Sequence, residues 1–251
     1  MPLDAPALRH PPGALADIPR SRLVALLAFC ASAAMGIPLE WYLPAALCWT
    51  AGALLIARDR DPAYRRRMAV LFAAVAILAA APIHTDTSTG HFIALGIPFL
   101  LVVVGPALLL GRTDPGVIRY RFRPRRFRWV DVGYVAISIP LAWLAFELYF
   151  KVLNPWVPGN WYLPPQPDAE ASWRLFIGIN CVGIWDELFF VNTVFSVLRS
   201  VFPFRAANAA QAVIYASVLT DMAFTGIGPV LVYLFALTQG TMFEESDNLI
   251  Y

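Results

Sequence analysis

The chain has 251 residues, of which 59% are hydrophobic and 14% are charged, and its formal net charge is +2. Ordinary soluble domains are only about 45–50% apolar, whereas this chain has a mean hydropathy of +0.62. This composition excludes an ordinary soluble domain, and the small net charge excludes a globally basic protein. We therefore expect an integral membrane protein.

Eight apolar runs approach the length of a membrane span, because a hydrocarbon core of about 30 Å requires around 20 helical residues. They predict an all-α fold, a polytopic membrane helix bundle with about eight transmembrane helices. No cleavable signal peptide is expected, since the first 20 residues are polar and rich in proline. The predicted spans are about 22–37, 41–57, 67–83, 92–111, 129–150, 173–198, 206–224 and 227–243.

Arginine is distributed unequally between the predicted loops. Five arginines follow or border the turn after the second span and seven lie in the loop after the fourth, whereas 84–91 and 154–172 contain no Arg or Lys. Cytoplasmic loops carry an excess of these residues. We therefore expect both ends of the chain to be cytoplasmic, and we expect the membrane to be a bacterial plasma membrane.

The loop after the fourth span contains RYRFRPRRFRW, in which arginine alternates with aromatic residues. Next to a membrane helix this pattern favours anionic lipid headgroups over nucleic acid, and each basic residue near the membrane surface contributes about 1 kcal/mol. The residues expected to bind headgroups are Arg119, Arg121, Arg123, Arg125, Arg126 and Arg128.

Metal and cofactor chemistry is not expected from the cysteines and histidines. The three cysteines lie in predicted spans without CxxC spacing, and the three histidines all precede the last three spans. Any chemistry in the membrane core therefore depends on carboxylate, amide, hydroxyl or phenol groups.

The sixth span contains two adjacent carboxylates in the stretch GINCVGIWDELFFVN. Asp186 follows Trp173 by 13 residues, which is about 20 Å along a helix. A carboxylate at the centre of a membrane helix costs about 2.5–3.5 kcal/mol on insertion scales. Asp186 and Glu187 are therefore either functional or a protonated, hydrogen-bonded contact that packs three helices together.

Polar residues around the pair are candidate supports for it. Asn208, Gln211 and Tyr215 are spaced three and four residues apart, so they form one stripe on the seventh span, which we expect to lie against the carboxylates. Ordinary hydrogen bonding between helices is the alternative explanation of this stripe. The other polar candidates are Asn180 on the face of Glu187, Asn192 after the apolar run, and Asp221 as a third carboxylate.

Two motifs resemble the CAAX-protease and bacteriocin-processing intramembrane proteases, the CPBP or Abi family. WDELFFVN, residues 185–192, resembles the EExxxR motif of that family, and ANAAQAVIYASVL, residues 207–219, resembles the surroundings of its FxxxH motif. The resemblance covers about residues 173–243. It implies an eight-helix membrane fold in which a Glu activates water while His and Asn residues steady the water or the oxyanion.

The chain departs from the family pattern at several positions. Asp186 replaces the first Glu, Val191 the Arg, Tyr215 the Phe and Leu219 the His, and Asn192 replaces a following Gly. The third family element, a later helix with His and often Asn, is absent before residue 251, so we expect the chain to be truncated. The resulting division is a cytoplasmic segment at 1–21, membrane helices with the Arg-rich loop at 22–128, and a CPBP-like core at 129–251.

Three hypotheses follow from these patterns. The first is a divergent intramembrane endopeptidase for membrane-embedded or prenylated peptides, with Asp186 or Glu187 as the base. The second is a pseudoprotease that binds a membrane segment, an isoprenoid-like lipid or a membrane protein. The third is a carboxylate-dependent transporter, although the sequence contains no internal repeat.

Overall fold

A computed structural model describes residues 15–83, 88–120, 129–153, 169–220, 226–246 and 249. Its regular elements are all helical, and these residues contain no strand, so the predicted all-α bundle is confirmed. In chain order they are η1 (Leu15–Asp17), α1 (Arg20–Gly36), α2 (Tyr42–Ala57), α3 (Pro62–Ala79), α4 (Thr89–Thr113), α5 (Trp129–Leu148), η2 (Tyr149–Leu153), α6 (Ala169–Asp186), η4 (Glu187–Phe195), α7 (Ser196–Arg199), α8 (Phe204–Leu219) and α9 (Gly228–Ser246).

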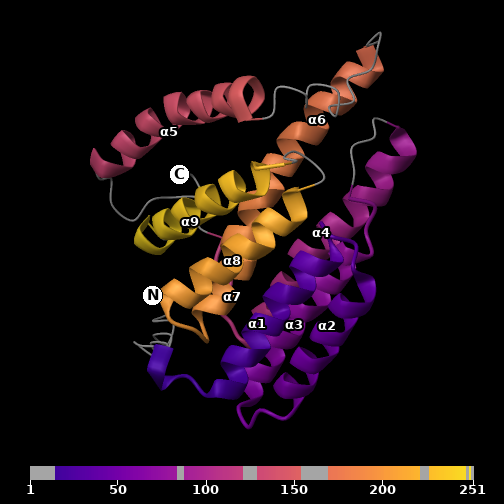
Figure 1. Ribbon diagram of the computed structural model, residues 1–251, viewed down its shortest axis with the longest axis vertical. Coiled ribbons are helices and arrows are strands. Elements are labelled where there is room, and N and C mark those ends of the chain that lie inside the picture. Colours follow the sequence, from indigo (N-terminus) through magenta and orange to yellow (C-terminus); the bar gives the residue numbers. More distant parts are fainter. Residues whose placement is uncertain are drawn as a thin grey trace, which may run out of the picture.

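The helices form a bundle in which α8 joins two groups. Helices α1 to α4 lie side by side, while α6, η4 and α7 form one continuous rod beside α8 and α9 (Figure 1). Helix α8 packs against α1 on one side and against η4 and α9 on the other. The seventh predicted span therefore lies where the two groups meet.

Each predicted span coincides with a helical segment, but the helices differ in length. Three are long and apolar enough to cross a membrane by themselves, namely Thr89–Thr113, Val132–Leu153 and Ala169–Arg199, and Tyr42–Ala57 is a shorter apolar helix. Helix α8 has only 16 residues, fewer than the roughly 20 that a full crossing requires. The described residues therefore support membrane association through three long helices, with shorter helices packed beside them.

Helix α5 stands apart from the rest of the bundle and is apolar around its circumference. The segment Val132–Leu153, which comprises most of α5 and η2, reaches a mean hydropathy of 1.5 and is almost entirely uncovered by protein, and Ile137, Ile139 and Trp143 are all exposed. Figure 1 shows α5 lying away from α1 to α4. A helix that is apolar all round and not covered by protein is suited to contact with lipid.

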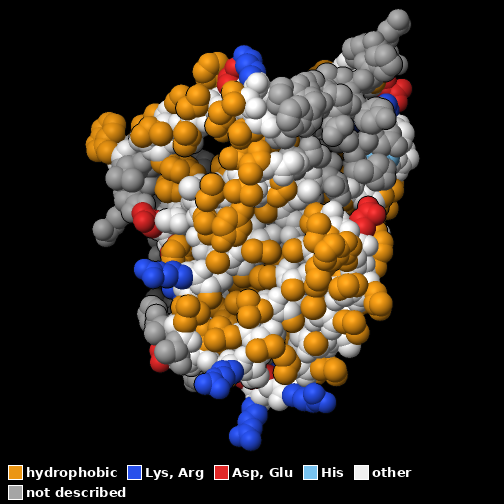
Figure 2. Space-filling model, in the orientation of Figure 1, with side chains coloured by type: hydrophobic (Ala, Val, Ile, Leu, Met, Phe, Trp, Pro, Cys, Tyr) orange, Lys and Arg blue, Asp and Glu red, His pale blue; other side chains and the backbone are white. Residues whose placement is uncertain are grey.

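Ion pairs gather at the end of the bundle where α2 turns into α3. Arg22 contacts Asp59 at 2.7 Å, and the nearly buried Asp114 accepts from Arg66 at 2.6 Å and from Arg67 at 3.0 Å. Basic side chains mark this end of the molecule in Figure 2, below a surface rich in hydrophobic side chains. These arginines contact acidic residues of the protein, so part of the positive charge at this end is neutralised internally.

Candidate intramembrane carboxylate site

The two carboxylates lie where the α-helix changes into a π-helix. Asp186 is the last residue of α6, and Glu187 begins the nine-residue η4. The Thr193 hydroxyl donates to the Leu188 carbonyl, five residues earlier, at 2.8 Å. π-helical turns are rare and are found frequently at functional sites. A single regular span was predicted here, so the π-helix corrects that expectation.

Helix α6 is fixed in rotation directly before the carboxylates. The Trp185 ring stacks on the ring of Phe99 in α4 with centroids 3.8 Å apart, and its indole N–H donates to the Phe99 carbonyl at 2.8 Å. On the other side, Trp185 stacks on Phe189 at 5.1 Å. The indole therefore sets which way Asp186 and Glu187 point.

The Glu187 carboxylate is bonded to an amide from the last helix. Gln239 Nε2 donates to Glu187 Oε1 at 2.8 Å, and Gln239 is buried within α9. Gln239 was not among the predicted site residues. Its position in a largely apolar predicted span could have identified Gln239 as a candidate, because a polar side chain at membrane depth requires a hydrogen-bonding partner.

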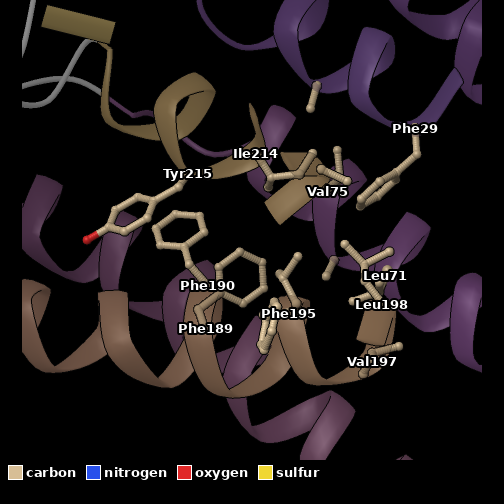
Figure 3. Close-up of a cluster of buried hydrophobic side chains, with 14 of the residues drawn as sticks. Phe29, Leu71, Val75, Phe189, Phe190, Phe195, Val197, Leu198, Ile214 and Tyr215 are labelled. Atoms are coloured by element: carbon tan, nitrogen blue, oxygen red, sulfur yellow. The ribbon is translucent and has the colours of Figure 1, made fainter. Parts of the chain in front are cut away.

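The Asp186 carboxyl and the phenol of Tyr215 are close enough to influence each other electrostatically, although no hydrogen bond joins them, and the Glu187 carboxylate also acts on the phenol. Asp186 Oδ1 is buried and has no hydrogen-bond partner among the described residues. Tyr215 is held by stacking on Phe190, with centroids 4.1 Å apart and an interplanar angle of 16°. Figure 3 shows the Phe190 and Tyr215 rings face to face within the aromatic cluster.

The other residues of the predicted stripe face the same side of α8. Asn208 Nδ2 donates to the Leu237 carbonyl at 2.9 Å and to Thr241 Oγ1 at 3.4 Å. Gln211 is completely buried, and neither of its amide atoms has a hydrogen-bond partner within the described structure. Each buried polar group without a partner lowers the free energy of unfolding by about 1–3 kcal/mol. Burial of the Gln211 amide without partners is therefore destabilising.

Asn192 is a second amide of this kind. It lies on η4, is completely buried, and keeps both side-chain atoms without a partner in the described part of the chain. Two fully buried amides with four free polar atoms are unusual, since the large majority of buried polar side-chain atoms in proteins are hydrogen-bonded.

Other predicted residues do not join the carboxylates or lie outside the described residues. Asn180 is exposed, and its amide donates to the Phe176 carbonyl one turn earlier at 2.8 Å. The prediction that Asn180 supports the Glu187 carboxylate is therefore wrong. Arg119 is half-buried and its Nε donates to the Gly116 carbonyl at 2.7 Å. Asp221, Arg121, Arg123, Arg125, Arg126 and Arg128 lie outside the described residues.

The two residues that stand where the CPBP motifs have Arg and His are packed into the apolar core. Val191, at the Arg position, is 2% exposed, and Leu219, at the His position, is 7% exposed. Among the described residues, no group of three or more His, Cys, Asp and Glu side chains is placed to hold a metal ion. The polar groups that the described residues bring to the site are two carboxyls, a phenol and amides.

Comparison with known proteins does not extend this description. No family model, no curated protein and no solved structure matches the chain. The resemblance to CPBP proteases therefore rests on the motifs at 185–192 and 207–219 alone.

Proposed function

We propose that the chain is a CPBP-like intramembrane endopeptidase homologue that retains the carboxylates, as Asp186 and Glu187, but has Leu219 in place of the catalytic His. In this proposal it holds a membrane-embedded or prenylated peptide at Glu187 and cleaves it slowly or not at all. The proposal includes a cytoplasmic N-terminus, because cytoplasmic loops carry an excess of arginine and the Arg-rich turns of this chain follow its second and fourth predicted spans.

The observation that carries this proposal is the hydrogen bond from Gln239 to Glu187 across η4 and α9. A carboxylate has two oxygens that accept hydrogen bonds. Gln239 occupies one lone pair of Oε1, so Glu187 can still accept a peptide N–H or take a proton from water. The amide thus fixes the carboxylate and leaves it competent to bind.

The adjacent groups complete a polar recognition site within apolar surroundings. The Tyr215 phenol is within electrostatic reach of Asp186, and its hydroxyl is a donor as well as an acceptor. A peptide carbonyl accepts from such a hydroxyl, while the apolar remainder of a membrane segment or prenyl chain matches the exposed apolar surfaces of α5 and α6. This combination supports a membrane-embedded ligand.

The buried apolar residues at the family's Arg and His positions explain why turnover is expected to be low. General acid–base groups typically contribute about 10²–10⁴ in rate. Val191 and Leu219 can supply neither an ion pair nor a proton relay, so Glu187 would be oriented by Gln239 but would act without a charged or proton-transferring partner. Binding is then the function that the remaining groups support.

A binding measurement in lipid nanodiscs tests this proposal. A fluorescent prenylated peptide and a membrane-anchored peptide are titrated with the wild type, Glu187→Gln and Glu170→Gln. Glu170 is the matched control, since it lies at the start of the same helix with its side chain 80% exposed. Loss of one hydrogen bond to a charged group costs about 1.5–3 kcal/mol, which is more than tenfold in affinity.

We expect Glu187→Gln to weaken binding by about tenfold or more and Glu170→Gln to leave it unchanged. Equal affinity of all three proteins would overturn the proposed binding site. Rapid cleavage that disappears in Glu187→Gln would instead show an active protease and contradict the loss of turnover.

A further inference from the structure

Exposed arginines gather at the end of the bundle where α1 begins and α2 turns into α3. They are Arg20, Arg58, Arg60 and Arg65, and we call them the arginine rim. Within the part of the chain that the structure describes, none of the four forms an ion pair. Basic side chains project from this end below the apolar surface in Figure 2. The rim therefore presents positive charge at the edge of an apolar surface.

A bidentate ion pair holds the two parts of the rim together. Arg22 Nε and Nη2 donate to the two carboxylate oxygens of Asp59, both at 2.7 Å. Arg22 lies in the first turn of α1, two residues after Arg20, and Asp59 lies between Arg58 and Arg60. Bidentate pairs of this kind fix orientation as well as distance. The start of α1 is therefore fixed against the α2–α3 turn, and the rim forms one surface.

The carboxylates near the rim already have partners. Asp59 is bonded to Arg22, and Asp61 Oδ1 accepts from two backbone N–H groups in the first turn of α3 at 2.9 and 3.3 Å. Asp114 accepts from two arginines of α3 that do not belong to the rim. Arg65 is within electrostatic reach of Asp59, but that carboxylate holds Arg22 with both oxygens. The rim thus keeps positive charge that an external anion can neutralise.

Exposed apolar side chains continue from the rim along α1 and α2. On α1, Val24 and Leu27 follow Arg20 by four and seven residues, so the three share one face. On α2, Leu54 lies four residues before Arg58 on the same face. Four residues correspond to about 6 Å along a helix. Each of these two arginines therefore lies one helical turn from an exposed apolar side chain, in the same order as the phosphate and acyl chain of a phospholipid.

We propose that the arginine rim binds the phosphate groups of anionic phospholipids, whose acyl chains lie along the exposed apolar faces of α1 and α2. Guanidinium groups suit this ligand because their planar set of donors matches phosphate oxygens. The site is separate from the arginine-rich loop after the fourth predicted span. It requires that the bundle lies in a membrane, and it does not depend on peptide binding at Glu187.

Lipid titration followed by native mass spectrometry tests the proposal. The protein in a neutral detergent is titrated with phosphatidylglycerol or with phosphatidylcholine of the same acyl chains, and the dissociation constant of the first bound lipid is measured. Arg58→Gln/Arg60→Gln removes two charges from the rim. Lys151→Gln/Arg174→Gln is the matched control, since it removes the same charge from η2 and α6, away from the α2–α3 turn (Figure 1).

We expect the wild type to bind phosphatidylglycerol at least tenfold more tightly than phosphatidylcholine. A contribution of about 1 kcal/mol per basic residue corresponds to about fivefold in affinity. Arg58→Gln/Arg60→Gln should therefore weaken phosphatidylglycerol binding by about tenfold or more, while the control keeps the wild-type preference. Equal affinity of the wild type for the two lipids, or an unchanged preference in Arg58→Gln/Arg60→Gln, would overturn the proposal.

Thermal unfolding in the same detergent distinguishes a lipid site from a structural role or a site for free phosphate. Arg58→Gln/Arg60→Gln should leave the midpoint without lipid unchanged, because both side chains are exposed and form no ion pair among the described residues. Phosphatidylglycerol should raise the midpoint of the wild type more than that of this variant, since a ligand stabilises the state that binds it. A lower midpoint of the variant without lipid, or an equal rise of the wild-type midpoint with inorganic phosphate, would contradict the lipid site.

Discussion

Helix α9 approaches α8 closely at Gly240, where a single added methyl group should disrupt the packing of the two helices. A Cβ at Gly240 would lie 2.0 Å from Asn208 Oδ1 and 2.9 Å from Asn208 Cγ. Such an approach is far inside van der Waals contact, so in Gly240→Ala either the Asn208 side chain rotates or α9 moves outwards.

The expected cost follows from the contacts that would change. Rotation of Asn208 breaks its bonds to the Leu237 carbonyl and Thr241 Oγ1, and such bonds average about 0.6 kcal/mol each in membrane proteins. Overpacking adds about 1–3 kcal/mol, while the higher helix propensity of alanine returns roughly 0.8–1 kcal/mol. We therefore expect Gly240→Ala to lower the free energy of unfolding by about 1–3 kcal/mol.

A double-mutant cycle in detergent, measured by denaturant or thermal unfolding, separates this clash from other effects. Asn208→Ala should remove most of the cost of Gly240→Ala, because the overlapping atoms belong to Asn208. Gly105→Ala is the control, since nothing lies within 4 Å of a Cβ there. The reasoning fails if Gly240→Ala is harmless or if its cost is the same with and without Asn208.

Further predictions concern acid stability, topology and catalysis. Burial raises the pKa of Asp114, but hydrogen bonds from Arg66 and Arg67 more than offset this, so its pKa lies below the ordinary 3.8. The stabilising contribution of ionised Asp114 is thus present above pH 3.8 and is lost as the pH falls through the folded-state pKa. Asp114→Asn should lower the thermal unfolding midpoint near neutral pH and reduce the fall of that midpoint on acidification. An unchanged fall would contradict the assignment. Cysteines at Ser172 and Thr113 in a cysteine-free background should be labelled by an impermeant reagent from outside and inside, respectively, and the reverse pattern would invert the topology. Leu219→His should raise peptide cleavage above a wild-type rate near background, whereas wild-type cleavage that is well above background and equal to that of Leu219→His would show that the imidazole is unnecessary.

The helices were predictable because hydropathy is a local property of the chain. Runs of apolar residues near the length of a membrane crossing mark each of the longer helices among the described residues. The stripe of Asn208, Gln211 and Tyr215 was predictable for the same reason, since three- and four-residue spacing places side chains on one face of a helix.

Contacts between distant segments could not be read from local pattern. Gln239 bonds to Glu187 across 52 residues, and Arg66 bonds to Asp114 across 48. Each pairing depends on how the helices are rotated and packed, which single-sequence periodicity does not specify. The π-helix at Glu187 likewise lacks a local signal such as Pro or Gly, and the Trp185 stack on Phe99 joins two separate spans.

The most direct test of the carboxylate site is the location of a photo-cross-link from a bound peptide. A prenylated or membrane-anchored peptide carrying a diazirine is irradiated with the wild-type protein and with Glu187→Gln in nanodiscs, and the adducts are mapped by mass spectrometry. We predict that the wild type carries adducts on η4 and on α9 around Gln239, and that Glu187→Gln carries few of them. Adducts on α1 to α4, or an unchanged pattern in Glu187→Gln, would contradict a peptide-binding site at Glu187.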